Sequence, residues 1–383
     1  AERVPADESA LLAPLTRFAQ GVAVAVVAVA MLATLISCVP EAPAPPQYGL
    51  TVRMGDGELL LDWDAPGAGS IDTYEVAVDD GVSGWQTWTT TASTSATFTD
   101  VEDRSAYRFR LRGLDGQGKP VGTWSPAVRA WFVEPVLPVV RIDTEDRAPI
   151  VDRTTKIDGT MEIDPNGSEY DAYQGVIEIR GRGNSTWFKE KKPYRIELDE
   201  DSELMGLPIH EDFVLLANFF DRSQLRTWTA AQASEATDLA YTPRYRHVEL
   251  ILNGEYQGVY QLTEDADKID PNRIDITEME DEDVTGEELT GGYLLEVDQR
   301  LEENSEPGFR TVHKQIPVVV KEPDPARPQQ MAYIRNHVQA LENSIVLPNF
   351  KDPVNGYRKY LDTSSFIDHY LVHELTRNHD YFF

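Results

Sequence analysis

The stretch Ile177–Leu198 reads IEIRGRGNSTWFKEKKPYRIEL, and its pattern decides the fold expected for the larger part of the chain. Residues 176–179 predict a strand, with Ile177 and Ile179 on one face and a charged residue between them. Residues 194–198 predict a second strand with the same alternation. The stretch is therefore expected to form two strands joined by a polar turn.

The turn between these strands is rich in glycine and arginine. Gly181 and Gly183 allow the backbone to approach an anion closely, and arginine offers a planar fork of donors to phosphate or carboxylate. A lysine on the sheet beside a glycine turn is one way to hold a nucleotide phosphate. On pattern alone, a basic hairpin with a solvated tip is the preferred interpretation.

Longer motifs carry a resemblance to a known family. RGRGNSTW followed by KKPYRIEL resembles the signature of the spore-coat-protein-H-type (CotH) kinases, an atypical kinase-like family. The resemblance continues through FVLLANFFDRSQLR, YTPRYRHVELILNGEYQGVYQLTE, GGYLLEVD and ELTRNHD. It covers roughly Val139–Phe383, about two thirds of the chain, and implies an α+β atypical protein-kinase-like domain over residues 139–383.

The resemblance also implies an activity and a set of site residues. The activity is transfer of the γ-phosphoryl group of ATP to Ser or Thr of a surface protein, with Mg²⁺ or Mn²⁺. Asp380 matches the family's catalytic aspartate, which orients a substrate hydroxyl and accepts its proton. The implied phosphate contacts are Arg180, Arg182, Asn184 and Lys192, with Lys191 as the rival of Lys192. Glu235 is a candidate partner for the lysine, and Glu264 is expected near the hinge that borders the adenine.

The match departs from the family in one respect. The aspartate that holds the metal lies downstream of the catalytic one in the family, which places it beyond Phe383. The metal ligands are therefore unknown, and the kinase-like domain is expected to be C-terminally incomplete and weakly active or inactive as given.

Length, charge and cysteine content bound the remaining possibilities. A chain of 383 residues predicts two folded units and a tail. The net charge of -30 argues against nucleic-acid binding and against electrostatic attachment to anionic lipid. It suits a basic, serine-rich protein substrate. The single cysteine excludes an internal disulfide framework and a multi-cysteine zinc site.

Residues 1–38 are expected to be a signal segment. Val22–Ile36 is almost wholly apolar, and its length of about 15 residues is short for a membrane span and suits a signal-peptide core. It runs into LISC, which resembles a bacterial lipobox, so Cys38 is the expected lipidation site; an uncleaved anchor is the alternative. Proline-rich residues 39–47 predict an extended tether. The expected location is extracytoplasmic, as a membrane-anchored lipoprotein at the bacterial cell surface.

Residues 48–135 predict an all-β unit, because apolar residues alternate in short runs that are separated by Gly, Asp and Ser turns. The pattern resembles a fibronectin type III domain. Trp63 is expected in its core, and Tyr107 stands where such domains carry a tyrosine corner. A spacing or docking role, and no chemistry, is predicted for this domain.

Two helices and one hairpin complete the prediction. A helix over 223–238 is expected to be capped by Ser223, and the last helix, 364–377, by Ser364. Asn253-Gly254 predicts a two-residue hairpin turn. The apolar residues of the last helix are expected to point inward, namely Phe366, Ile367, Tyr370, Leu371 and Leu375.

Two other functions fit parts of the pattern. The first is a surface adhesion or assembly protein whose catalytically silent kinase-like fold serves binding. The second is a carbohydrate-active hydrolase, which ranks last because no carboxylate pair stands out by motif.

Overall fold

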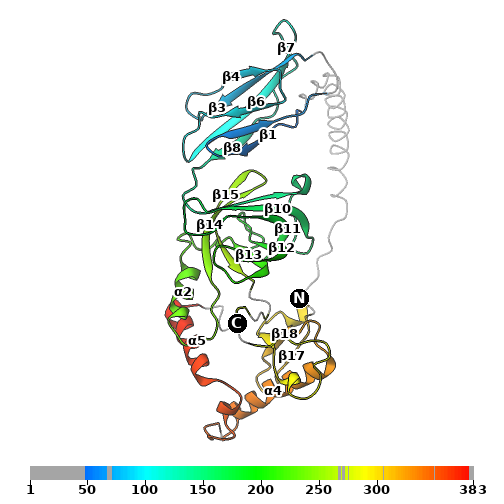
Figure 1. Ribbon diagram of the computed structural model, residues 1–383, viewed down its shortest axis with the longest axis vertical. Helices are drawn as coiled ribbons and strands as arrows, with labels where there is room; N and C mark the ends of the chain where they lie inside the picture. Colours follow the sequence, from blue (N-terminus) through cyan, green and yellow to red (C-terminus); the bar gives the residue numbers. More distant parts are fainter. Residues whose placement is uncertain are drawn as a thin grey trace, which may run out of the picture.

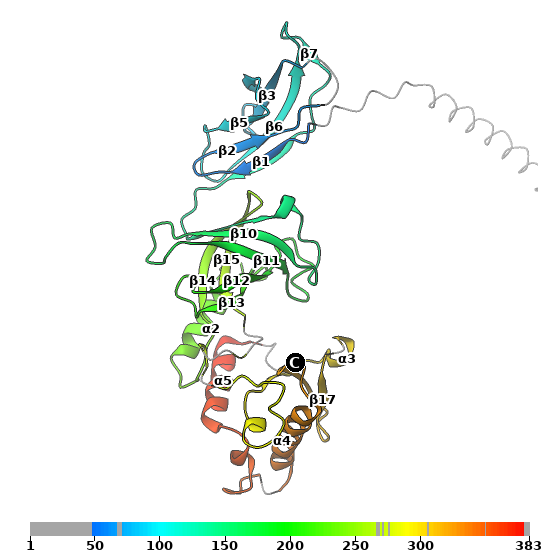
Figure 2. The same ribbon diagram turned by 45° about the vertical axis from the view of Figure 1, so that its right-hand side comes forward.

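The structure is a computed structural model, and it describes residues 48–66, 71–265, 269, 272–274, 276–304, 306–348 and 350–378. Cys38 and the segments 1–38 and 39–47 lie outside these residues, as does Asp380. Three parts follow one another along the longest axis: a β-sandwich, a β-barrel and a mixed C-terminal part (Figures 1 and 2). Among the described helices, none combines the length and the apolar character that a membrane span needs.

The sandwich consists of two antiparallel sheets. The first has the order β1-β2-β5, from Thr51–Met54, Leu59–Asp62 and Ser95–Phe98. The second has the order β4-β3-β6-β7, with β8 also pairing with β6. Its strands are β3 (Thr73–Asp79), β4 (Gln86–Thr91), β6 (Ser105–Leu114), β7 (Pro120–Val121) and β8 (Val128–Phe132).

Aromatic residues fill the space between the two sheets. Trp63 is buried against Tyr74, and Phe98 packs against Phe109 with ring centroids 5.4 Å apart. The Tyr107 hydroxyl accepts a hydrogen bond of 2.7 Å from the Glu102 N–H, which is the tyrosine corner of this fold. The predicted fibronectin III-like sandwich is confirmed.

Seven strands close the barrel, in the order β10-β11-β12-β13-β15-β14-β9. All neighbours are antiparallel except β14 and β9, whose parallel pairing closes the ring. The strands are β9 (Val139–Thr144), β10 (Ile157–Asp164), β11 (Tyr173–Gly181), β12 (Tyr194–Ser202), β13 (His210–Leu216), β14 (Tyr245–Leu252) and β15 (Glu255–Glu264). A short 3₁₀ turn, η2 (Glu145–Arg147), follows β9.

The alternation of the opening stretch sets the inside of the barrel. Ile177 and Ile179 of β11 and Ile196 of β12 are buried in one apolar core, while the residues between them face outward. The turn at Asn253 and Gly254 has positive φ at both residues, 52° and 79°, as a two-residue hairpin loop between twisted strands requires. The predicted strands and hairpin are therefore present.

The sandwich and the barrel share an interface. The backbone N–H of Met54 donates to the carbonyl of Gly254 over 2.7 Å, and Ile251 belongs to the apolar core of the sandwich. The buried Glu249 side chain accepts hydrogen bonds from the backbone N–H groups of Val136 and Leu137. The two parts are therefore joined by side-chain and backbone contacts as well as by the chain itself.

The C-terminal part mixes one small sheet with helices. Its sheet has the order β16-β18-β17, and Ile334 of α4 packs on it beside Phe309. Its elements are η3 (Glu288–Thr290), β16 (Leu294–Glu296), α3 (Leu301–Asn304), β17 (Gly308–Arg310), β18 (Pro317–Glu322), α4 (Pro328–Val346), η4 (Tyr357–Lys359) and α5 (Thr363–Thr376). With α2 (Arg226–Glu235), which lies between β13 and β14 in the chain, this mixture fits the predicted α+β kinase-like domain.

Three details of the helix predictions are wrong. Asp362, two residues before the predicted serine, caps α5 by accepting from the Ser364 N–H over 3.0 Å. Ser223 does not cap α2, whose N-cap is Leu225 without a side-chain cap hydrogen bond; the Asp221 carboxylate accepts instead from the N–H groups of Ser223 and Arg226. The apolar residues predicted to point inward on α5 are exposed, because α5 packs on α2 and buries Val372 instead. Their exposed fractions run from 42% at Tyr370 to 75% at Leu375.

Candidate functional site

A pocket of about 900 Å³ lies where the glycine turn, α2 and the end of α5 come together. Its volume falls in the range of about 300–1,000 Å³ that is usual for small-molecule sites. The helices α2 and α5 contact each other along one of its sides (Figure 1). The turn contributes Arg182 and Thr186 to the lining, and residues 216–221 follow from the last residue of β13 onward. Tyr241 precedes β14 and Tyr245 is its first residue. His369 and His373 of α5 and the two residues after it, Arg377 and Asn378, complete this part of the lining.

The pocket is cationic, although the chain as a whole carries a net charge of -30. Among the residues that the structure describes, Arg182, Arg226 and Arg377 line it against one carboxylate, that of Asp221. That carboxylate is already engaged, because hydrogen bonds from Ser223 and from the Arg226 N–H lower its pKa despite partial burial. The arrangement favours an anionic ligand.

The glycine turn is tightly constructed. At Gly183, φ is +84° and a Cβ would lie 2.3 Å from the Thr186 hydroxyl, so only glycine fits. The N–H of Gly181 donates to the Asp152 carbonyl over 2.9 Å, and that of Arg182 donates to the Pro193 carbonyl over 3.1 Å. These two amides are therefore used within the protein, and the turn offers its Arg182 side chain to the pocket.

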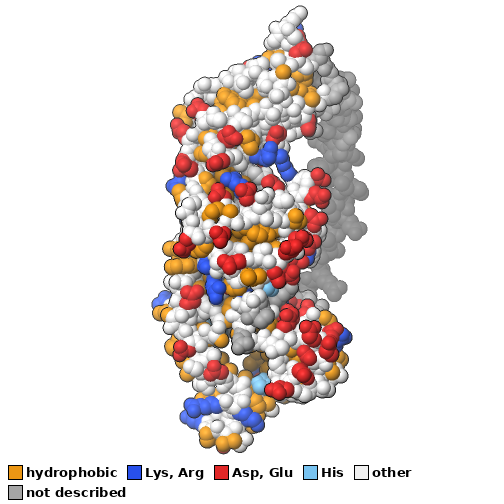
Figure 3. Space-filling model, viewed as in Figure 1, with side chains coloured by type: hydrophobic (Ala, Val, Ile, Leu, Met, Phe, Trp, Pro, Cys, Tyr) orange, Lys and Arg blue, Asp and Glu red, His pale blue; other side chains and the backbone are white. Residues whose placement is uncertain are grey.

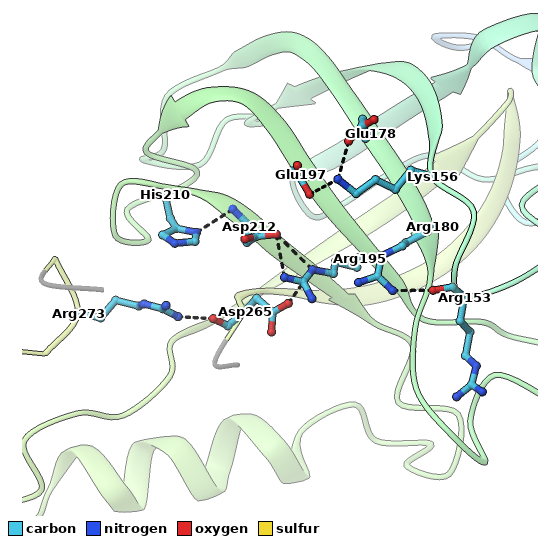
Figure 4. Close-up of polar contacts among 10 residues, drawn as sticks. All are labelled: Arg153, Lys156, Glu178, Arg180, Arg195, Glu197, His210, Asp212, Asp265 and Arg273. Atoms are coloured by element: carbon cyan, nitrogen blue, oxygen red, sulfur yellow. Dashed lines mark hydrogen bonds and ion pairs between the residues drawn. The ribbon is translucent and has the colours of Figure 1, made fainter. Parts of the chain in front are cut away.

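The other residues of the turn face elsewhere. The Arg180 guanidinium donates to the Arg153 carbonyl over 2.6 Å (Figure 4). Arg153 in turn donates to the Gly183 carbonyl and to the side-chain oxygen of Asn184, over 2.8 and 3.0 Å. Arg180 and Asn184 therefore brace the turn, and neither lines the pocket.

The two lysines are also engaged outside the pocket. Lys191 donates to the Val259 carbonyl and sits over the Tyr260 ring, and burial lowers the pKa of its amine to about 8. Lys192 donates to the Trp187 carbonyl over 2.8 Å and sits over the Trp187 ring. Of the five predicted phosphate contacts, the structure brings Arg182 alone to the pocket lining. The other four side chains are engaged elsewhere: Arg180 and the two lysines donate to backbone carbonyls, the lysines also lie over aromatic rings, and Asn184 accepts from Arg153.

The two predicted glutamates differ in their surroundings. Glu235, a candidate partner of the lysine that the sequence fits better as a solvated helix charge, accepts a hydrogen bond from Gln232 over 2.8 Å and forms no ion pair with Lys191 or Lys192 among the described residues. Glu264 is buried at the end of β15, where its carboxylate accepts from the Arg244 N–H over 2.9 Å. Burial raises the pKa of Glu264. The pKa values of Tyr241 and Tyr245 are raised mainly by the burial of these tyrosines and further by the nearby negative charge of Glu264. Glu264 thus lies close behind the two tyrosines of the pocket wall.

The end of α5 brings two histidines to the pocket. The rings of His369 and His373 lie edge to face with centroids 4.3 Å apart, and desolvation lowers the pKa of both imidazoles. Asn378 joins them, its side-chain amide 2.9 Å from Nδ1 of His373. Asp380 follows two residues later, outside the described residues. The sequence analysis missed the histidines, whose spacing of four on one helix face was the available signal.

A charged network supports the barrel beside the site (Figure 4). Arg195 of β12 forms ion pairs of 3.0 Å with Asp212 of β13 and with Asp265, directly after β15. Both carboxylates are fully buried. Arg273 donates to the Asp265 carbonyl, so this network links the barrel to the segment that leaves it.

Comparison with known families decides which family this chain belongs to. The family described as "CotH kinase protein" matches residues 179–383, more than half of the chain, from β11 through α5. The chain belongs to the CotH kinase family. A second match, to the fibronectin type III domain, covers residues 44–131. No curated protein matches the chain at a significant level.

Solved structures similar to the chain are fibronectin type III domains. The sixth such domain from human fibronectin type III domain containing protein 3 is 16% identical, with a TM-score of 0.22, over 26% of this chain and 94% of that one. The fn3 domain of human contactin 1 is 14% identical, with a TM-score of 0.21, over 25% of this chain and 81% of that one. An Fn3-like protein from Clostridium thermocellum is 24% identical, with a TM-score of 0.19, over 25% and 98%.

The CotH kinase family implies a nucleotide and a divalent metal in general. Across the described ranges, no three His, Cys, Asp or Glu side chains gather as a metal-ion site. Among the described residues that line the pocket, Asp221 alone carries a carboxylate, and it accepts from the Arg226 N–H at the start of α2. No metal ligand is therefore assigned within this CotH kinase domain, and no chemical step is routed through the metal.

Proposed function

We propose that this protein is an extracytoplasmic, lipid-anchored atypical protein kinase that uses ATP to phosphorylate Ser or Thr of a surface protein. The observation that carries the proposal is the cationic pocket beside the glycine turn, in a chain whose net charge is -30. A triphosphate is the ligand that such a pocket suits, because arginine binds phosphate oxygens through two parallel hydrogen bonds.

Arg182 is the proposed phosphate contact of the turn. It is the first residue after β11, and the constrained Gly183 beside it fixes the path of the backbone. The bracing of the turn by Arg153 and Arg180 supports the same role, because a rigid turn holds a ligand group without a further ordering cost. Transferring a phosphoryl group is mainly a matter of positioning and charge stabilisation, which such a turn supplies.

Asp380 is the proposed catalytic residue, by family and by its place in the chain. Asn378, which lines the pocket, precedes it by two residues. In the proposed reaction the Asp380 carboxylate accepts the proton of the attacking Ser or Thr hydroxyl. The oxygen of that hydroxyl bonds to the γ-phosphorus of ATP, and ADP leaves. Mg²⁺ or Mn²⁺, when bound, would neutralise charge on the phosphates.

A basic, serine-rich surface protein is the proposed substrate. Acidic side chains gather on the face of Figure 3 along one side of the barrel and of the C-terminal part. The segment 278–288 alone carries Glu278, Glu280, Asp281, Glu282, Asp283, Glu287 and Glu288. Such a surface attracts a cationic chain over about a Debye length, 8–10 Å at moderate salt. The membrane attachment, through Cys38, belongs to the same proposal.

Labelled ATP tests the proposal. The chain is incubated with γ-labelled ATP, Mg²⁺ or Mn²⁺, and a peptide rich in serine and arginine, beside an Asp380→Ala variant and a peptide in which glutamate replaces arginine. Label on the basic peptide that is lost in Asp380→Ala supports the kinase. Nucleotide that neither binds nor reacts contradicts it and favours a catalytically silent surface adhesion or assembly protein.

A further inference from the structure

The residue directly after α5 has an unusual backbone. Arg377 follows α5 with φ 53° and ψ 43°, in the left-handed region. Its N–H donates to the Glu374 carbonyl, and the N–H of Asn378 donates to the His373 carbonyl over 3.0 Å. This is the Schellman ending of a helix, in which glycine is the residue usually found at the left-handed position. A non-glycine residue there costs free energy that glycine would not.

The Arg377 side chain lines the pocket without a counter-charge. Among the residues that the structure describes, no carboxylate, carbonyl or aromatic ring partners its guanidinium. Arg226 differs, because its Nε lies 3.8 Å from Asp221, whereas the Arg182 side chain has no hydrogen-bond, ion-pair or aromatic partner among the described residues either. An arginine outside the pocket with the same backbone conformation, Arg104 (φ 58°), has Asp103 within 3.5 Å.

Arg182 and Arg377 come from different parts of the domain. Arg182 belongs to the turn at the end of the barrel, and Arg377 to the end of α5 in the C-terminal part, yet both line the same pocket. Two guanidinium groups on separate elements can bind one anion that has several phosphate groups along its length. A single monovalent anion would need only one of them.

We infer that Arg377 is a second phosphate-binding residue, and that the bound triphosphate is held between the barrel and the end of α5. The inference rests on the proposed nucleotide site and gives a role to the arginine of the ELTRNHD motif, to which the sequence analysis assigned none. The polyphosphate chain then links the two parts of the domain. The unfavourable backbone conformation of Arg377 is kept because glycine at this position would carry no guanidinium.

Calorimetric titration of the full chain tests this inference, with Mg·ATP as one ligand and adenosine as the other. Arg377→Gly removes the guanidinium and places glycine where the backbone is left-handed, and Arg377→Asn removes the guanidinium with a residue that also tolerates this conformation. Arg104→Gly makes the same change at a left-handed arginine outside the pocket and is the matched control. We expect both Arg377 variants to bind Mg·ATP about tenfold to a hundredfold more weakly, the usual loss for a charge-assisted contact. Adenosine binding should not change, and Arg104→Gly should bind Mg·ATP as the unmodified chain does.

Thermal unfolding without ligand gives the second measurement. The Arg377→Gly variant should unfold at the same temperature as the unmodified chain or higher, because glycine relieves the left-handed position. An Arg377→Gly chain that binds Mg·ATP as tightly as the unmodified chain, while Arg182→Ala weakens it, overturns the inference and leaves the proposed function standing. An unmodified chain that does not bind Mg·ATP contradicts the proposed function, and this inference with it.

Discussion

Replacing Arg195 by methionine should destabilise the barrel strongly. Arg195 pairs with Asp212 and Asp265 at 3.0 Å each, and its own side chain is 17% exposed while both carboxylates are 0% exposed. Methionine fills a similar volume but takes the Arg195 cation away from two buried carboxylates. Breaking a buried ion pair in this way costs about 3–5 kcal/mol. At about 2–4 °C per kcal/mol for a domain of this size, the melting temperature should fall by about 6–20 °C.

Lys156→Met is the matched control on the same barrel. Lys156 also bridges two carboxylates, Glu178 at 2.7 Å and Glu197 at 2.6 Å, but the three side chains are 40%, 41% and 33% exposed. Solvent screens such a surface network, so its loss should cost less than about 1 kcal/mol. The two substitutions remove the same charge from the same kind of triad, and burial is the main difference between them.

Urea unfolding followed by circular dichroism, with thermal scans, measures both effects. Adding Asp212→Asn to Arg195→Met removes one of the two buried negative charges that Arg195 had faced and should recover part of the loss. If Arg195→Met costs no more than Lys156→Met, the argument from burial is refuted. If the added Asp212→Asn destabilises the chain further, the claim that buried negative charge is the cause is refuted.

Three further outcomes are expected. Gly183→Ala should cost about 1–2 kcal/mol or more of stability for its positive φ, and it should weaken Mg·ATP binding by displacing the turn. Gly57→Ala is the control, because Gly57 has φ +71° but nothing within 4 Å of the new Cβ, so that this change should cost only the free energy of the positive φ. Unfolding and titration experiments compare the two variants. Burial lowers the pKa of Lys191 to about 8, so between pH 8 and about pH 10.5 the folded chain has released this proton while the unfolded chain still holds it. The free energy of unfolding should therefore rise with pH across this window, relative to that of the Lys191→Met variant. A difference in unfolding free energy between the two proteins that stays constant with pH would contradict the assignment. Glu249→Leu leaves the N–H groups of Val136 and Leu137 without their acceptor, so it should cost about 1–3 kcal/mol of stability. It should also loosen the attachment of the sandwich to the barrel, which small-angle X-ray scattering would show as a broader distance distribution. An unchanged distribution would contradict the role of Glu249 in this attachment.

Alternation and turn chemistry predicted much of the fold. The period of two in Ile177 and Ile179 is a local consequence of strand geometry, and so is the Asn253-Gly254 turn. The barrel closure was not predictable, because the parallel pairing of β14 with β9 joins residues more than a hundred positions apart. No local pattern encodes such a contact. The same holds for the cap of α5, where Asp362 competes with the equally suitable Ser364.

The site was predicted in part. Arg182 and Arg180 look equivalent in the motif, but β11 ends at Gly181, so Arg180 still belongs to the strand and Arg182 begins the turn. Lys191 could not be placed, because its acceptor, the Val259 carbonyl, is distant in the chain. Arg377 stands in the ELTRNHD motif, but an arginine near a helix end is usual and its left-handed backbone is visible only in the structure, so no role was predicted for it.

A crystal structure of the chain with Mg²⁺ and a non-hydrolysable ATP analogue tests the central claim most directly. The account predicts that the triphosphate lies in the pocket between the glycine turn and α5, with a phosphate oxygen about 3 Å from the Arg182 guanidinium. Nucleotide bound elsewhere, for example against Lys191 and Lys192 with the pocket empty, would contradict it.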